Sequence, residues 1–289
     1  MQNPPVFPAG SLAVVSVPIG HPGDITLRAL DVLAQADVIA AEDTRTARRL
    51  LSHHGIRRPL VSYHDWNETE RASSLVDRLA RGERVALISE AGTPGLSDPG
   101  FDVVRAARRQ GLAVFPVPGP SAVTAFLSVA GLPTDAFSFH GFPPSRSSAR
   151  RTFFARLAER GETLVFYESP RRILASLSDA LLALGERECA LAREMTKTHE
   201  EFFFGTLTSV RATLAERPKV LGEVCWGVRG CPGPCPAGEE DVADAVARAL
   251  AAGIPLKEAA KELAGTLRIS AKEAYRQLLA QRQGDLGPR

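Results

Sequence analysis

The sequence predicts an α/β protein with two sheet-bearing domains and a small helical module near its C-terminal end. Its 289 residues suit two domains at roughly 150 residues each. Apolar residues make up 44% and charged residues 24%, which is typical of a globular chain that buries a full core. Short apolar runs alternate with amphipathic helical patterns through the first half, as in an α/β layer. The net charge of +2, from 35 basic and 33 acidic residues, excludes a histone-like polycation or an acidic tail.

Four strand and helix pairs account for the first 130 residues. Each apolar run is followed by a segment with helical periodicity, which predicts a mainly parallel sheet. The expected strands are residues 12–17, 38–41, 85–89 and 113–117. The expected helices are residues 25–35, 44–54, 101–110 and 121–130.

The second half begins after a linker-like segment at residues 142–148, which holds two prolines and three serines. This segment predicts a boundary between a first domain at 1–140 and a second at 141–230. After a first helix, the expected strands are residues 163–167, 188–192, 202–207 and 223–228, and the expected helices are 171–184 and 208–216. Because helices and strands do not alternate regularly here, we expect a mixed sheet.

A third region follows the glycine and proline cluster at residues 230–238. We expect a helical module at 239–289, with helices at 241–252, 256–263 and 271–281. Ser270 and Glu273 form a capping box for the last of these helices. The module has helix-turn-helix proportions, but its eight acidic and eight basic residues balance. We therefore expect a packing or docking module rather than an independent DNA reader.

Several sequence features indicate where in the cell the protein works. The longest uncharged stretch, residues 110–134, contains Pro116, Pro118 and Pro120, so we expect no membrane-spanning helix there. The first ten residues lack the pattern of a secretory signal, and four cysteines suit a reducing compartment, which predicts a cytoplasmic protein. Cys231 and Cys235 have the spacing of half a zinc site, but a second pair is missing and we expect no metal.

Four polar turns are the candidate functional segments. The sequence has neither a Gly-x-Gly-x-x-Gly turn nor a P-loop, which disfavours an ordinary Rossmann or P-loop enzyme. Instead, turns rich in glycine, proline and charge follow the predicted strands at residues 18–24, 41–45, 89–100 and 116–122. Open α/β sheets bind ligands at the carboxyl ends of their strands. The four turns therefore predict one ligand site, although the first of them can equally be a plain connection.

The charged residues of these turns suggest specific uses. Glu42 and Asp43 follow a buried strand, where carboxylates either cap a helix or serve a site. Asp43 alone can be a helix cap, which leaves Glu42 in need of another explanation. Glu90 suits ribose hydroxyls or a cationic group of a ligand. Ser121 and Ala122 open a helix whose first N–H groups are free to bind a ligand.

Three other features allow two interpretations each. The segment 63–68 mixes aromatic and hydrogen-bonding side chains, which either stack on unpaired bases or form a capped helix start. The strand ends at 167–172 and 192–201 both carry charge, and for 192–201 the alternative to a site is a solvated loop. Two groups of arginines form either phosphate-binding patches or solvated helix faces. They are Arg45, Arg48, Arg49, Arg57 and Arg58, and Arg146, Arg150, Arg151 and Arg156.

Taken together, nine ordered motifs resemble the tetrapyrrole-methylase superfamily of S-adenosylmethionine enzymes. They are Pro18-Ile19-Gly20, Ala41-Glu42-Asp43-Thr44-Arg45, His64-Asp65-x-Asn67-Glu68, Ala91-Gly92-Thr93-Pro94, Asp98-Pro99-Gly100, Pro118-Gly119-Pro120-Ser121-Ala122, Gly131-Leu132-Pro133, Tyr167-Glu168-Ser169 and Ala192-Arg193-Glu194-x-Thr196-Lys197. The resemblance covers residues 12–228. It implies the two-domain α/β fold of class III S-adenosylmethionine methyltransferases, a homodimer, and a cofactor in the cleft between the domains.

The resemblance also implies an activity and its residues. The most similar branch of the superfamily 2′-O-methylates a cytidine ribose in the decoding region of small-subunit (16S) ribosomal RNA in the 30S subunit. The implied contacts to S-adenosylmethionine are Pro18, Glu90, Thr93, Ser121, Ala122 and Tyr167. The chain departs from the family pattern at three places, which affects the assignment of these contacts. Glu90 replaces the usual aspartate, His21-Pro22 replaces Asn-Leu, and the chain diverges from the family pattern after Glu223.

The candidate catalytic groups come from charge at the strand ends and from the resemblance. Removing the proton of a ribose hydroxyl calls for a nearby base, and we expect Glu42 or Asp43 in that role. Arg45 is the expected phosphate clamp, and Lys197 with Glu194 is the expected contribution of the second domain. Two alternatives stay open: a tetrapyrrole or other small-molecule methyltransferase of the same superfamily, and a non-catalytic module that binds RNA or the ribosome.

Overall fold

The computed structural model describes residues 7–64, 68–231 and 254–267, together with positions 246, 249, 272, 274–276, 278 and 279. The chain divides into two compact units, Met1–Gly230 and Cys231–Arg289. None of the helices within the described residues is both long and apolar enough to cross a membrane. The same residues hold no group of three or more His, Cys, Asp or Glu side chains arranged for a metal ion.

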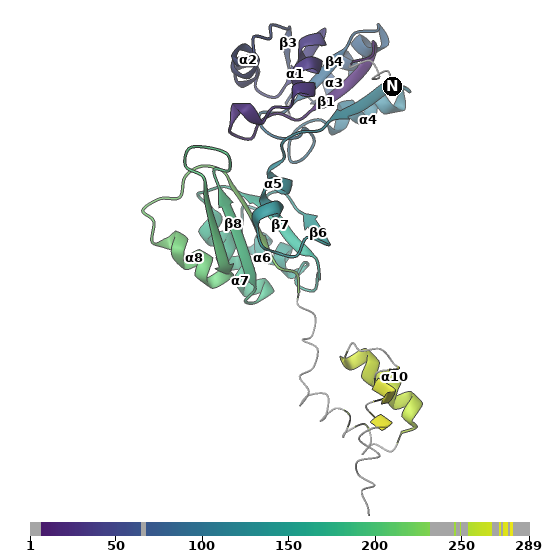
Figure 1. Cartoon of the computed structure of the whole chain (residues 1–289), viewed down its shortest axis with the longest axis vertical. Coiled ribbons are helices and arrows are strands. Elements are labelled where there is room, and N and C mark those ends of the chain that lie inside the picture. The colour runs from purple at the N-terminus through teal and green to yellow at the C-terminus, as the bar shows by residue number, and fades with distance from the viewer. Residues whose placement is uncertain are drawn as a thin grey trace, which may run out of the picture. The chain divides into compact units, whose positions relative to one another are not determined.

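The first unit contains two five-stranded sheets, of which the first is entirely parallel (Figure 1). Its strand order is β3-β2-β4-β1-β5. The strands are β1 (Ser11–Val15), β2 (Val38–Ala41), β3 (Leu60–Ser62), β4 (Val85–Ile88) and β5 (Ala113–Val117). The helices that connect them are η1 (Pro22–Asp24), α1 (Leu27–Gln35), α2 (Thr44–His53), α3 (Glu68–Ala80) and α4 (Phe101–Arg109). The predicted parallel layer is confirmed.

Alternating side chains let this sheet pack helices on both faces. Ala13 and Val15 of β1 face the cluster that contains apolar residues of α1 and α2. Leu12 faces the opposite cluster, with apolar residues of α3 and α4. Because successive strand residues point to opposite faces, an unbroken apolar run is what a doubly covered strand requires.

Two elements of this layer, β3 and α3, were absent from the prediction. β3 is only three residues long and half-buried at the sheet edge, so its hydrophobic signal is weak. α3 carried a usable signal, since its buried residues fall at a helical spacing. They are Ala72, Leu75, Val76 and Leu79.

The second sheet is mixed, as predicted, with strand order β6-β7-β10-β8-β9. Its first pair is parallel and the other three are antiparallel. The strands are β6 (Phe137–Phe139), β7 (Thr163–Glu168), β8 (Glu188–Arg193), β9 (Glu201–Thr206) and β10 (Val224–Val228). The helices of this half are α5 (Ala122–Val129), α6 (Ser147–Ala155), α7 (Ile173–Leu184) and α8 (Leu207–Ala215).

The two faces of this sheet have different coverings. One face packs Leu164, Phe166 and Trp226 against α6, α7 and α8. The other packs Val165 and Cys225 against α5, and this cluster also includes residues of the turn after β1 and of the segment after β8. The second face therefore connects with the carboxyl edge of the first sheet, where the candidate site lies.

The predicted boundary near residue 140 lies after the point where the chain passes from the first sheet to the second. The chain leaves the first sheet after Val117, and α5 already contacts β10 of the second sheet. The boundary near 140 stays a prediction. The last two residues of the predicted linker, Ser147 and Ser148, form the start of α6.

Arg150 corrects one expectation about the arginine patches. Its side chain is 3% exposed and pairs with Asp179 of α7 at 2.6 Å. It also donates hydrogen bonds to the carbonyls of Pro144 and Ser145 at 3.3 and 3.1 Å. A buried, fully paired guanidinium cannot bind a phosphate of an external ligand, so Arg150 serves the fold instead.

The second unit is described only in part. Helix α10 (Leu256–Leu267) covers the predicted helix 256–263. Its apolar side packs in one cluster with Val246, Ala274 and Leu278. The predicted helices 241–252 and 271–281, the capping residue Ser270 and most of the cluster 230–238 with Cys235 lie outside the described residues.

Candidate functional site

The polar turns meet at the carboxyl edge of the first sheet and line a cavity of about 1050 Å³. Strand β1 lies between β4 and β5 in the sheet, while the chain passes from β1 to β2 on the far side of β4. Loops diverge at such a reversal of strand order, which is where open α/β sheets bind ligands. All six predicted cofactor contacts line this one cavity. They are Pro18, Glu90, Thr93, Ser121, Ala122 and Tyr167.

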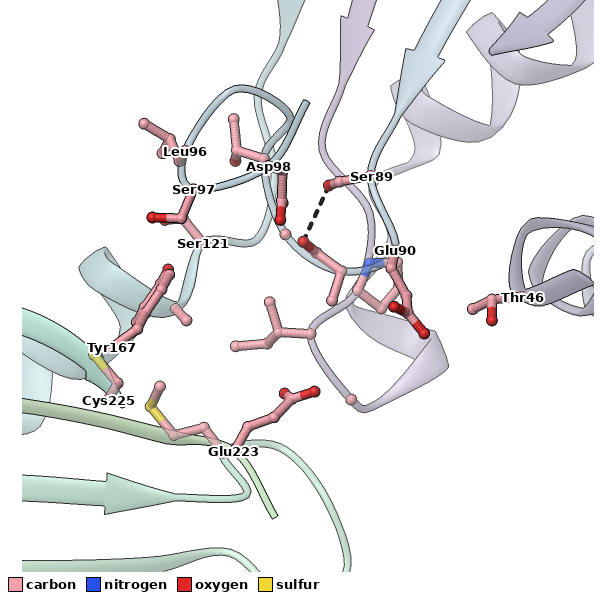
Figure 2. Close-up of a pocket in the computed structure, with 18 of the residues that line it drawn as sticks. Thr46, Ser89, Glu90, Leu96, Ser97, Asp98, Ser121, Tyr167, Glu223 and Cys225 are labelled. Carbon is pink, nitrogen blue, oxygen red and sulfur yellow. Dashed lines mark hydrogen bonds between the residues drawn. The ribbon is translucent and has the colours of Figure 1, made fainter. Parts of the chain in front are cut away.

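Apolar side chains of the second sheet line one side of the cavity. Figure 2 shows Tyr167 and Cys225 on this side, with Ser97, Asp98 and Glu90 contributed by the loop after β4. The Tyr167 ring lies 4.8 Å from that of Phe139 and 5.6 Å from that of Phe142. Burial raises the pKa of the Tyr167 hydroxyl and of the Cys225 thiol. Both groups therefore stay protonated at neutral pH and add no charge to this side.

The loop after β4 is tied to the ends of β1 and β5. Val17 and Gly92 exchange backbone hydrogen bonds of 2.9 and 3.0 Å, and Gly92 adopts a φ of +77° that favours glycine. The Thr93 hydroxyl lies 2.8 Å from the Ser16 hydroxyl and donates to the Pro120 carbonyl at 3.1 Å. Thr93 thus joins its own loop to the end of β1 and to the turn after β5.

Glu68 holds the far end of the same loop, a role that sequence reasoning left open. One of its carboxylate oxygens accepts hydrogen bonds from the Tyr63 hydroxyl and from the backbone N–H groups of Gly100 and Asp102, at 2.9 to 3.1 Å. A carboxylate at the start of α4 satisfies the free N–H groups of that helix. Glu68 thus caps α4 rather than the start of its own helix, α3, and residues 65–67 of the predicted segment lie outside the described part of the chain.

Of the three predicted catalytic residues at the end of β2, only one reaches the cavity. Glu42 lines the cavity, and its carboxylate accepts a hydrogen bond from the Glu90 backbone N–H at 3.4 Å. Asp43 and Arg45 do not line it. Asp43 caps α2 by accepting from the N–H groups of Arg45 and Thr46 at 2.7 and 3.4 Å. Hydrogen bonds from the Arg45 side chain and backbone lower the pKa of Asp43 to about 2, which makes it a weak base.

Lys197 lines the cavity between two carboxylates. Its ammonium group lies 3.0 Å from Glu194 and 3.1 Å from Glu223. Burial works against its charge, but the hydrogen bond to Glu194 and the Glu223 carboxylate outweigh burial and raise the pKa of Lys197. Lys197 is therefore a cation at neutral pH rather than a base. Glu223 lines the cavity but was not among the predicted site residues, because it stands where the chain departs from the family pattern.

The segment that carries Lys197 has a strained backbone. Glu194 and Thr196 have φ values of +53° and +62°, and Ser97 has +65°. These are the non-glycine residues with positive φ within the described ranges, and all three lie at or beside the cavity. Such strain costs about 1 to 3 kcal/mol per residue and persists where the surroundings enforce it. It is common at functional sites.

Gly20 allows the turn after β1 to approach this segment closely. A Cβ atom at Gly20 would stand 2.5 Å from Cγ of Lys197 and 2.6 Å from Oγ1 of Thr196. The backbone N–H of His21 donates to the same Thr196 hydroxyl at 3.1 Å. His21, one of the departures from the family pattern, also caps η1 through its ring nitrogen.

Glu168 of the motif Tyr167-Glu168-Ser169 is buried beside the cavity. It pairs with Arg172 at 2.6 Å, and it accepts hydrogen bonds from the Ser169 backbone and the Ser176 hydroxyl. These contacts tie the end of β7 to the start of α7. Glu168 therefore fixes the backbone on which Tyr167 is placed.

A comparison with family models identifies the class of enzymes to which a chain with this fold and cavity belongs. Residues 11–211 match the family of tetrapyrrole (corrin/porphyrin) methylases. The match spans more than half of the chain, and the chain belongs to this family.

The particular relatives carry a more specific name. A ribosomal RNA small subunit methyltransferase I of Haemophilus influenzae is 45% identical over 256 residues, which cover 87% of this chain and 90% of the relative. A protein of the same name from Pseudomonas aeruginosa is 44% identical over 281 residues, which cover 96% of this chain and 99% of the relative.

Solved structures agree on the fold. A uroporphyrin-III-C-methyltransferase from Thermus thermophilus aligns with a TM-score of 0.56 at 23% identity, covering 78% of this chain and 96% of that one. A cobalt precorrin-4 methyltransferase aligns with a TM-score of 0.57 at 17% identity, covering 75% and 94%. At these identities the likeness establishes the fold alone.

Proposed function

We propose that this protein is an S-adenosylmethionine-dependent methyltransferase that 2′-O-methylates a cytidine ribose in the decoding region of small-subunit ribosomal RNA. The main support is that six residues spread from position 18 to 167 line a single cavity with Glu42 and Lys197. The shared name of the relatives supports the RNA substrate. The proposal includes a homodimer that acts on the 30S subunit in the cytoplasm.

The cavity has the chemistry that S-adenosylmethionine requires. Its apolar side, with Ile19, Tyr167 and Cys225, suits the adenine ring and the carbon chain next to the sulfonium. The Glu90 carboxylate suits ribose hydroxyls, and it carries one methylene more than an aspartate would. The backbone around Ser121 opens α5, where unpaired N–H groups favour a carboxylate. The bound cofactor supplies a methyl group activated on a positively charged sulfur.

The reaction is an in-line displacement in which alignment supplies much of the rate. The ribose 2′-oxygen forms a bond to the methyl carbon while the carbon–sulfur bond breaks and its electron pair stays on sulfur. The hydroxyl proton passes to a carboxylate. Correct alignment of two bound reactants contributes roughly 7 to 11 kcal/mol in well-oriented systems, and the tied loops of this site provide that rigidity.

Among the candidate groups, Glu42 is the proton acceptor that the geometry favours. It lines the cavity, whereas Asp43 and Arg45 are paired with each other outside it. Lys197 is held as a cation by Glu194 and Glu223. Its proposed role is therefore to orient the methyl donor rather than to remove the proton. General bases contribute roughly 10² to 10⁴-fold to such reactions.

The test supplies purified protein with methyl-labelled S-adenosylmethionine and three acceptors: 30S subunits, protein-free 16S RNA and uroporphyrinogen. We expect label in the 30S subunits, located by mass spectrometry on the ribose of one cytidine. Glu42→Gln should lower this rate while calorimetry shows unchanged cofactor affinity.

The alternatives give different results in the same assay. Label in uroporphyrinogen alone would identify a small-molecule methyltransferase. No heat of binding with S-adenosylmethionine, combined with binding to 30S subunits, would identify a non-catalytic module. Label on a cytosine base would overturn the 2′-O assignment.

A further inference from the structure

One arm of the cavity extends along α2, away from most of the proposed cofactor contacts. We call it the α2 arm and define it by Glu42, Thr46, Arg49, Leu50 and His53, which all line the cavity. Figure 2 shows Thr46 on α2, with the Glu90 side chain extending toward it. The whole cavity, about 1050 Å³, is slightly larger than the range of roughly 300 to 1,000 Å³ that is usual for one drug-sized ligand. The volume therefore leaves room for a second reactant beside the cofactor.

Helix geometry explains which side chains of α2 reach this arm. Thr46, Arg49, Leu50 and His53 follow the i, i+3, i+4, i+7 spacing of one helix face. Arg48 lies about 200° around the helix axis from Thr46, and it does not line the cavity. The helix thus directs one arginine toward the cavity and another to the opposite side.

The charges of the α2 arm change sign along its length. Glu42 accepts a hydrogen bond from the Glu90 backbone at the sheet edge. Arg49 is exposed and has no carboxylate partner within the described residues, whereas Arg45 on the same helix is paired with Asp43. His53, one turn further along, is exposed as well. The arm therefore has a carboxylate at its inner end and nitrogen donors toward solvent.

A nucleotide within an RNA strand matches this order of charge. Its ribose hydroxyl suits a carboxylate acceptor, and its phosphate suits a guanidinium, which binds phosphate through paired hydrogen bonds. S-adenosylmethionine carries a ribose and a carboxylate, but the N-terminus of α5 already suits that carboxylate, and a tetrapyrrole carries carboxylates but no ribose. A phosphate joined to a ribose is the chemistry that uses both ends of the arm.

We infer that the α2 arm is the subsite for the target nucleotide of the RNA, with Arg49 and His53 holding its flanking phosphate and Glu42 facing its 2′-hydroxyl. This inference rests on the proposed function and assigns a place within that site to the acceptor. It also separates Arg49 from the other exposed arginines of this region, which lie outside the cavity.

The test compares Arg49→Gln with Arg48→Gln, which removes the same charge from the opposite face of the same helix. Both variants are assayed with 30S subunits for KM, kcat and the salt dependence of RNA binding, and by calorimetry for S-adenosylmethionine. Arg49→Gln should raise KM for RNA roughly tenfold, as expected for loss of one charged hydrogen bond, and lower the salt slope by about one unit. Arg49→Lys should restore part of the loss. Arg48→Gln should leave KM close to the wild-type value.

The remaining outcomes overturn the inference in distinguishable ways. Equal effects of the two variants would mean that α2 attracts RNA only through its general charge. Weaker S-adenosylmethionine binding in Arg49→Gln, with KM for RNA unchanged, would assign the arm to the cofactor. If the wild-type protein methylates no RNA at all, the proposed function is wrong, and the assignment of the subsite is wrong as well.

Discussion

At the scale of single residues, the site depends on how closely the turn after β1 approaches the segment after β8. Gly20 lies against Lys197, Thr196 and the carbonyl of Met195, at distances that no side chain can occupy without movement. The Glu194 carboxylate fills the corresponding space next to Gly222. Small residues at these two positions allow the ion pairs of Lys197 to form beside the cavity.

Gly20→Ala should therefore slow methyl transfer strongly. Its Cβ would meet Lys197 Cγ at 2.5 Å and the Met195 carbonyl oxygen at 3.0 Å, so the segment carrying Lys197 must shift. A misplacement of about 1 Å can cost roughly 100-fold in rate. The measurement is single-turnover methylation at saturating cofactor, together with thermal unfolding to verify that the variant is folded.

Gly161→Ala is the matched control, because a Cβ at Gly161 would meet no atom within 4 Å. It should methylate at the wild-type rate. A folded Gly20→Ala protein that also kept the wild-type rate would show that the position of Lys197 does not matter for the reaction.

At the scale of elements, a buried ion pair joins α6 to α7 beneath the second sheet. Arg150 and Asp179 are 3% and 9% exposed, and the Ser147 hydroxyl donates to the same carboxylate at 3.0 Å. The pair fixes the start of α6 and, through Pro144 and Ser145, the segment that leads into it. Phe142, which lines the cavity, lies just before that segment.

Arg150→Met should destabilise the protein, because it leaves the Asp179 carboxylate buried without its partner. Breaking a buried pair from one side costs about 3 to 5 kcal/mol. Chemical denaturation measures the change in the free energy of unfolding. The control is Arg151→Met, since Arg151 is exposed on the same helix and surface changes usually stay within about 0.5 kcal/mol. Equal stability of the two variants would refute the structural role of Arg150.

At the scale of the whole molecule, every described residue that lines the cavity belongs to the first compact unit. Its lining residues extend from Pro18 to Cys225, and the unit ends at Gly230. Both sheets and all four apolar clusters that surround them lie within the same unit. Units with their own core generally fold by themselves.

A chain that ends at Gly230 should therefore fold and bind S-adenosylmethionine with the affinity of the full chain. Calorimetry of the two proteins provides the comparison, and circular dichroism shows whether the shorter one is folded. A folded short chain that no longer bound the cofactor would mean that residues 231–289 contribute to the cofactor site.

Much of the candidate site was predictable because its signals are local. A polar, glycine-rich turn after an apolar run is visible in sequence, and parallel strands end at one edge of their sheet. Pro18, Glu90, Thr93, Ser121 and Ala122 were found in this way and by resemblance. Glu223 was missed because its motif diverges, and Glu68 was noticed without a clear role because its partners, Gly100 and Asp102, are more than thirty positions away.

By itself, the sequence determined the parallel layer, the mixed layer and the set of turns that carry polar, potentially ligand-binding residues. These features are readable because hydrophobic periodicity and turn residues act over a few positions. Only the tertiary structure decided which charged residues face the cavity. Asp43 and Arg150 carry the same kinds of charge as Glu42 and Arg49, yet the first pair is occupied by local or buried partners. The direction of a side chain depends on helix phase and on neighbours that are distant in sequence, and neither is readable from residue type alone.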